Sequence, residues 1–312
     1  MIIGLLSALM GLTGCAPALP RGCPAECVAA DLTGKSLENV NLSQARLMEA
    51  NLRKANLAGA NLSQSDLSGA NLIEANLVKT QLTGAILFGA DLTKAQLDHA
   101  DLSGADFTGS DLTQADLTGA IMNQAVLKGV NLTAAELIGV NLSGMQLNAV
   151  ILERANISGI DLSHADLSGA TLSGANASGS IMTQTTLAGA WLNRTNLTSS
   201  DLTSANLSGA SLYAADLSGT NLQGADLRGV NFVGADLSGA DLRGADLDGA
   251  IFLLQDFVDT AMIDTDAVIT ALNQAAQAAL AKDANLCGAR YNRQTHWPED
   301  FEVPVCAVFS ED

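Results

Sequence analysis

The sequence predicts an all-β solenoid of short stacked coils, and three observations lead to that prediction. A leucine-centred unit recurs every five residues from Leu32 to Phe252, without insertion or deletion. A period of five fits neither the helical repeat of about 3.6 residues nor the alternation of a strand. All glycines between Gly34 and Gly249 lie two residues after a unit's centre. The backbone therefore turns once in every unit, and successive turns of about 90° close a square coil of about 20 residues.

Two further positions of the unit have a restricted composition. Leucine occupies 38 of the 45 central positions, which we call the central column. The position two residues earlier, the small column, holds Ala in 29 units and mostly Ser, Thr or Val in the others. Large and small side chains that alternate around a square would fill a narrow interior. Residues 20 apart are then stacked neighbours, so Val130 on Val150 and Val140 on Ile160 predict a wider interior near the sixth and seventh coils.

These columns resemble the A(D/N)LXX units of the pentapeptide-repeat proteins. The resemblance implies a right-handed quadrilateral β-helix of about 11 coils, about 53 Å long at the usual spacing between strands. The central and small columns would point inward and the other three columns would face solvent. The expected division of the chain is residues 1–14 as a signal peptide, 15–29 as a lipidated N-terminal cap, 30–255 as the β-helix, and 256–312 as a helix followed by a stapled cap.

The N-terminus reads MIIGLLSALMGLTGCAPALP and has the character of an export signal. Its apolar run is too short to span a bilayer as a helix and ends in small residues, as signal peptides do. The stretch Leu12 to Cys15 is similar to the lipobox of bacterial lipoproteins, which implies that Cys15 carries the lipid anchor. No Lys or Arg precedes the run, and an uncleaved apolar tail on a cytosolic protein is the alternative.

The other four cysteines form two pairs outside the repeat, Cys23 with Cys27 and Cys287 with Cys306. An even count behind an export signal is typical of disulfides in an oxidising compartment. A four-cysteine zinc site would need all four together, whereas the rod would hold the two pairs about 50 Å apart.

The C-terminal 256–312 segment departs from the repeat. Asp264 to Asp266 supplies helix N-cap candidates before an Ala-rich run to Lys282. We expect this helix to lie across the last coil, because an open strand edge invites aggregation. The following tail resembles the C-terminal cap of bacterial pentapeptide-repeat proteins, with Cys287 and Cys306 as its staple.

Composition and spacing argue against catalysis. The formal net charge of −18 lacks the basic footprint that nucleic-acid binding requires. A straight, solid rod provides little concave surface, and His99 and His164 would lie on different edges, so we expect no enzyme activity, metal, cofactor or small-molecule substrate. Stacked acids such as Asp226 and Asp246 are interpreted as solvated repeat positions.

One outward face becomes less polar and is a candidate protein-binding patch. Ile151 and Trp191 occupy its Asp/Asn column, with Arg194 and Tyr213 beside Trp191. Exposed aromatic and aliphatic side chains can anchor a partner. Drift in a tolerant repeat, or proximity to lipid or glycan, is the alternative interpretation.

Three functions remain from these observations. The favoured one is a non-catalytic envelope lipoprotein, a structural or protein-interaction scaffold tethered through Cys15. The resemblance to bacterial lipoproteins implies that Ala16 after the cysteine favours the outer membrane, facing the periplasm. The second follows from the family resemblance, since some acidic members mimic DNA and occupy DNA gyrase, which is cytosolic. The third, an enzyme or metal binder, has the least support.

Overall fold

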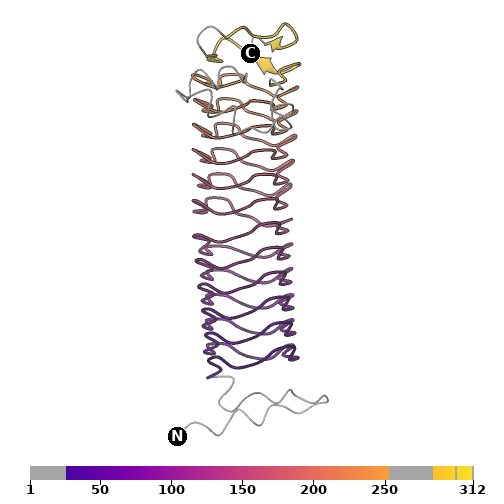
Figure 1. Cartoon of the computed structure of the whole chain (residues 1–312), viewed down its shortest axis with the longest axis vertical. Coiled ribbons are helices and arrows are strands. Elements are labelled where there is room, and N and C mark those ends of the chain that lie inside the picture. Colours follow the sequence, from indigo (N-terminus) through magenta and orange to yellow (C-terminus); the bar gives the residue numbers. More distant parts are fainter. Residues whose placement is uncertain (1–25, 253–283, 299–300, 311–312) are drawn as a thin grey trace, which may run out of the picture.

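The computed structural model describes residues 26–252, 284–298 and 301–310, and the first of these ranges forms one straight solenoid (Figure 1). Parallel bridges join residues 20 apart on each side, for example Asp31 to Asn51 and Ser36 to Asn56. Four units therefore make one coil. The square coil of 20 residues predicted from the glycine register is confirmed.

The interior consists of the two columns that the sequence assigned to it. Central-column residues from Leu32 to Phe252 are 0–2 % exposed. The small column is also buried over most of its length, and its hydroxyl groups are paired: Ser65 Oγ donates to Leu62 O at 2.7 Å and Thr80 Oγ1 to Leu57 O at 2.9 Å. Buried polar groups cost little when they are hydrogen-bonded, so Ser and Thr are accepted among the alanines.

Each corner of the square is a hydrogen-bonded turn. The N–H of a small-column residue donates to the preceding central-column carbonyl, as Ala55 N does to Leu52 O at 2.9 Å. Every fifth residue from Gly34 to Gly249 has a positive φ, whether or not it is glycine; Lys54, for example, has φ 58°. Glycine is preferred there because a side chain strains that conformation. The backbone turn inferred from the glycines is therefore correct, and it persists where glycine is absent.

The C-terminal tail continues the ladder instead of leaving it. Asn285, Arg290 and His296 bridge to Asp236, Asp241 and Asp246. The physical reason is visible in the stretch ANLCG, residues 284–288, which repeats the five-residue unit and buries Leu286. On these three sides the tail therefore covers the edge that we had expected the helix to cover. The expected helix, to Lys282, lies outside the described residues.

Two short strands and an aromatic cluster close this end. Strand β1, Arg290–Tyr291, pairs in parallel with β2, Val308–Phe309. A disulfide joins Cys287 to Cys306, with their Cα atoms 4.7 Å apart. Phe252 stacks on Phe232 at 5.2 Å between ring centroids and also contacts Phe301, and Trp297 stacks on Phe301. The large flat rings fill the end of a core that elsewhere consists mainly of Leu and Ala.

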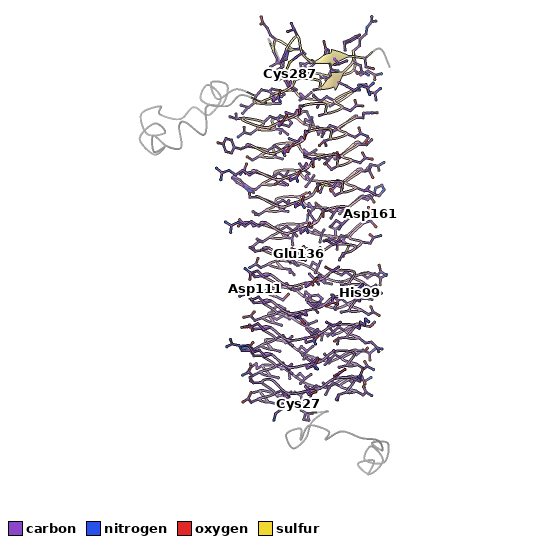
Figure 2. The ribbon with its side chains drawn as sticks, turned by 90° about the vertical axis from the view of Figure 1, so that its right-hand side faces the viewer. Cys27, His99, Asp111, Glu136, Asp161 and Cys287 are labelled. Atoms are coloured by element: carbon purple, nitrogen blue, oxygen red, sulfur yellow. A yellow bond between two sulfur atoms is a disulfide. The ribbon has the colours of Figure 1, made fainter. Side chains whose placement is uncertain are left out.

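Cys27 and Cys287 lie at opposite ends of the rod (Figure 2). Cys27 is buried and disulfide-bonded. Cys15, Cys23 and the expected signal peptide lie outside the described residues. Within the ranges that the structure describes, no helix is long and apolar enough to cross a bilayer.

Candidate functional site

The ladder is interrupted at one place, between the segments 121–130 and 141–150. Within residues 26–252, every pair of bridging positions 20 apart is joined except two, Ile121 with Asn141 and Val126 with Gln146. Six inter-coil backbone hydrogen bonds are therefore not made there. The unpaired N–H groups belong to Met122, Gln124, Leu127, Gly129, Asn141 and Gln146, and the matching carbonyls to Ala120, Ala125, Asn141, Ser143, Gln146 and Asn148.

The two missing bridges lie on adjacent sides of one coil, and the next corner also lacks the bonds from Gly139 N to Ser158 O and from Asp161 N to Val140 O. On the other two sides, Asn131 is bridged to Ile151 and Glu136 to Asn156. The same residues also bridge to the preceding coil, Asn131 to Asp111 and Glu136 to Asp116. The two coils are thus joined by bridges on two sides and separated on the other two.

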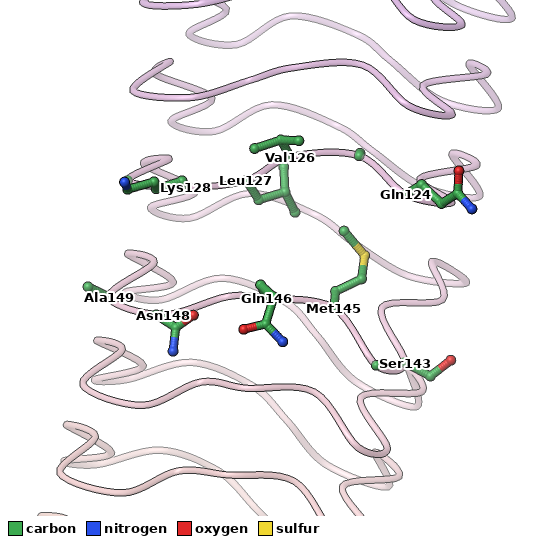
Figure 3. Close-up of a pocket in the computed structure, with 12 residues that line it drawn as sticks. Gln124, Val126, Leu127, Lys128, Ser143, Met145, Gln146, Asn148 and Ala149 are labelled. Atoms are coloured by element: carbon green, nitrogen blue, oxygen red, sulfur yellow. The ribbon is translucent and has the colours of Figure 1, made fainter.

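The split opens a crevice of about 840 Å³. Its apolar lining comes from Ala125, Val126, Leu127 and Met145, and Figure 3 shows the Met145 side chain extending into the space between the two segments. Polar side chains also line it, namely Gln124, Lys128, Ser143, Gln146 and Asn148. The volume falls in the range of natural ligand pockets, about 300–1,000 Å³, and the lining combines apolar and polar side chains.

A smaller opening of about 250 Å³ lies on the adjoining part of the split. Asn123, Gln124, Asn141, Ser143 and Met145 line it. Gln124, Ser143 and Met145 therefore line both openings, which lie along the same split.

Met145 accounts for the position of the split. It is a methionine in the small column, stacked in register with Ala125 of the preceding coil, and it is only partly buried. Valine alone does not open the ladder, because Val230 is fully buried in the same column while Ser211–Asn231 and Asn231–Ile251 remain bridged. Four more bulky small-column residues occur nearby, at Val130, Val140, Val150 and Ile160.

The wider interior expected from Val130, Val140, Val150 and Ile160 stays a prediction, and the broken ladder beside Met145 was not predicted from the sequence. The signal was present, since Met145 is the one methionine in a column of mostly Ala, Ser, Thr and Val. Its long side chain does not fit where a methyl group normally packs, and overpacking forces backbone shifts.

The acidic and amide side chains of the Asp/Asn column are used by the fold. Asp91 Oδ1 accepts the N–H of Thr93 at 3.0 Å, and Asn61 Oδ1 accepts that of Ser63 at 3.0 Å. The pattern recurs along the rod and engages one oxygen of many of these side chains in the turns. Amides also form a ladder across coils, in which Asn196 Nδ2 donates to Asn176 Oδ1 at 3.2 Å.

The same hydrogen bonds keep several carboxylates charged. The Ser168 hydroxyl and backbone N–H hold the pKa of Asp166 below its ordinary value. Hydrogen bonds from the Arg228 guanidinium lower the pKa of Asp226, with Arg228 Nη2 2.6 Å from Asp226 Oδ2. Depressed values favour ionised, structural carboxylates over proton donors at neutral pH.

The structure brings only some residues of the expected partner patch close together. Trp191 is 56 % exposed, and the Arg194 N–H donates to the Tyr213 carbonyl at 2.9 Å, which puts these residues on adjacent coils. Ile151 is exposed on the same side, but Thr171 lies between it and Trp191 in the ladder. The four residues form a broken stripe, and its role in binding remains a prediction.

Within the described ranges, no three His, Cys, Asp or Glu side chains gather as metal ligands would. His99 and His164 occupy turn positions with φ 57° and 59° on different sides of the coil.

The square coils and inward columns define the class of protein, a quadrilateral β-solenoid built from five-residue units. Eight copies of the family model for pentapeptide repeats match the chain, at residues 25–64, 50–87, 65–104, 85–124, 123–154, 146–184, 180–219 and 215–252. The chain belongs to the pentapeptide-repeat family. No curated protein sequence matches it significantly.

Two solved structures of pentapeptide repeat proteins share about a third of their aligned residues with this chain, and a third structure is more distant in sequence. HetL, a pentapeptide repeat protein involved in heterocyst differentiation regulation in the cyanobacterium Nostoc sp. strain PCC 7120, is 33% identical over 80% of this chain and 89% of its own, with a TM-score of 0.32. A pentapeptide repeat protein of the Arabidopsis thaliana thylakoid lumen is 34% identical over 33% of this chain and 65% of its own, with a TM-score of 0.18. Full-length QnrB1, a plasmid-mediated fluoroquinolone resistance protein, is 15% identical over 73% of this chain and 94% of its own, with a TM-score of 0.23.

Proposed function

We propose that this protein is a non-catalytic scaffold for protein interaction, held in the cell envelope by a lipid on Cys15. The observation that carries the scaffold is the crevice, an apolar space bordered by unpaired backbone in an otherwise solid rod. Such a surface suits recognition of another chain, whereas the carboxylates that a catalyst would use are engaged in turns. The exposed Trp191 stripe is a second contact surface for a partner.

The envelope placement rests on the lipobox and on the disulfide chemistry. Cys287 is bonded to Cys306 and Cys27 is also disulfide-bonded, which suits an oxidising compartment. A lipoprotein-type cysteine carries several acyl chains, and each buried CH₂ contributes about 0.8 kcal/mol to membrane binding. Ala16 favours the periplasmic face of the outer membrane.

Fractionation of a Gram-negative host that expresses the full chain, with and without Cys15→Ala, tests the placement. We expect globomycin-sensitive processing and membrane association for the wild type only. Equal amounts of both forms in the cytosol, with reduced cysteines, would contradict it. Inhibition of gyrase supercoiling would then be the next assay, because stacked acids such as Asp226 and Asp246 also suit a DNA-mimicking rod.

A further inference from the structure

The two segments that border the crevice present complementary, unused main-chain groups. Segment 121–130 offers four N–H donors, at Met122, Gln124, Leu127 and Gly129. Segment 141–150 offers the carbonyls of Asn141, Ser143, Gln146 and Asn148. These are the groups that hold neighbouring coils together elsewhere in the rod. An unpaired strand edge is a template for another backbone.

We propose that the crevice binds an extended peptide segment of a partner protein, which pairs with the free backbone of segments 121–130 and 141–150. This inference deepens the proposed scaffold function and rests on it, since it names the chemistry of the partner. A small apolar molecule could fill the space beside Leu127 and Met145, but it would leave the main-chain groups unpaired. A peptide satisfies both parts of the site, through strand addition.

The lining indicates which side chains such a peptide carries. Ala125, Leu127 and Met145 form the apolar part of the crevice, so side chains facing them are small or medium aliphatics. Lys128 lines the rim, and no acidic residue is among the lining residues. A peptide with alternating inward apolar and outward polar residues, including a carboxylate, fits this arrangement.

The chain itself supplies a suitable probe. Residues 236–245, DLSGADLRGA, form two repeat units that bridge to coils on both sides, through Asp236 to Asp216 and Asn285, and through Asp241 to Asn221 and Arg290. Its leucine N–H groups both donate in the ladder, Leu237 to Asn285 O and Leu242 to Arg290 O at 2.7 Å. A synthetic copy N-methylated at the two leucines keeps the side chains and removes these donors.

Amide hydrogen exchange of the disulfide-intact full chain measures the pairing. With the unmethylated peptide we expect exchange at Met122, Gln124, Leu127 and Gly129 to slow by about tenfold or more, and we expect no such change with the methylated peptide. Equal binding of both peptides would overturn strand addition. So would free-protein exchange at these four amides as slow as at paired Leu102, which would mean that the split is closed in solution.

Two substitutions in the small column complete the test. Met145→Ala restores the usual residue, so the ladder closes and peptide binding falls by about tenfold or more. Val230→Ala shortens a side chain of the same column at a place where the ladder is intact, and we expect peptide binding to be unchanged. Unaltered binding by Met145→Ala would contradict the proposal. These measurements use purified protein, so their failure is distinct from failure of the fractionation that tests the envelope placement.

Discussion

Ala125 and Met145 lie 20 residues apart in the small column and face each other across the crevice, where segments 121–130 and 141–150 share no backbone hydrogen bond. Everywhere else in the repeat, residues in this relation belong to bonded coils. A single long side chain in place of a methyl group thus coincides with the one break in the ladder of residues 26–252. This pair is therefore the most direct target for mutagenesis of the split.

Replacing Met145 with Ala should stabilise the protein. The change removes the side chain that separates the coils and allows up to six backbone hydrogen bonds to form, each contributing about 0.5–1.5 kcal/mol net. After subtracting the lost methionine contacts, we expect the free energy of unfolding to rise by about 1–3 kcal/mol. Thermal and denaturant unfolding measure it. Met182→Ala is the control, since Met182 is fully buried in the central column and its truncation should cost about 2–5 kcal/mol. A loss of stability in both variants would refute this account of the split.

Replacing Leu207 with Asp should unfold the coil around it. Leu207 is 0 % exposed, and an unpaired buried charge costs about 3–5 kcal/mol or more. Circular dichroism melting curves report the loss. Asn206→Asp, one residue earlier in the Asp/Asn column, should leave the curve nearly unchanged. Matching curves for the two variants would show that the central column does not point inward.

Replacing Thr195 with Val should weaken the contact between two coils. Thr195 Oγ1 donates to Leu172 O at 2.8 Å in the core, and Val is accepted in this column at Val230. We expect a loss of about 1 kcal/mol, the net worth of a typical hydrogen bond. Thr198→Val is the control, because only the backbone N–H of Thr198 is hydrogen-bonded to Asn196 in the described structure. Equal effects of both changes would argue against the buried hydroxyl bond.

Removing Arg228 should raise the pKa of Asp226. Hydrogen bonds from Arg228 depress that pKa in the folded chain. A depressed folded-state value stabilises the fold above the unfolded pKa, about 3.9, and this contribution disappears as pH falls through the folded value. NMR titration of the Asp226 carboxyl in Arg228→Gln should show a higher midpoint than in the wild type. Arg53→Gln should leave the Asp226 midpoint unchanged. An unchanged midpoint in Arg228→Gln would show that Arg228 does not lower the pKa of Asp226.

Much of the fold follows from local pattern. The glycine register predicted the turn, and the central and small columns predicted the core from Leu32 to Phe252. The C-terminal end was harder to predict, because the chain leaves the repeat after Phe252 and resumes it in the unit 284–288. One unit of ANLCG resembles many sequences, whereas its pairing with Asp236 depends on where residues far apart in the chain meet.

The amino-acid sequence alone specified the period, the square coil and the inward columns, because each unit repeats the same steric preferences locally. The three-dimensional structure was needed to find the open crevice, the unpaired backbone of segments 121–130 and 141–150, and the tail on the last coil. Each of these depends on a balance between side-chain volume and hydrogen bonding across coils. That balance joins residues 20 or about 50 positions apart, so no single unit of the sequence reveals it.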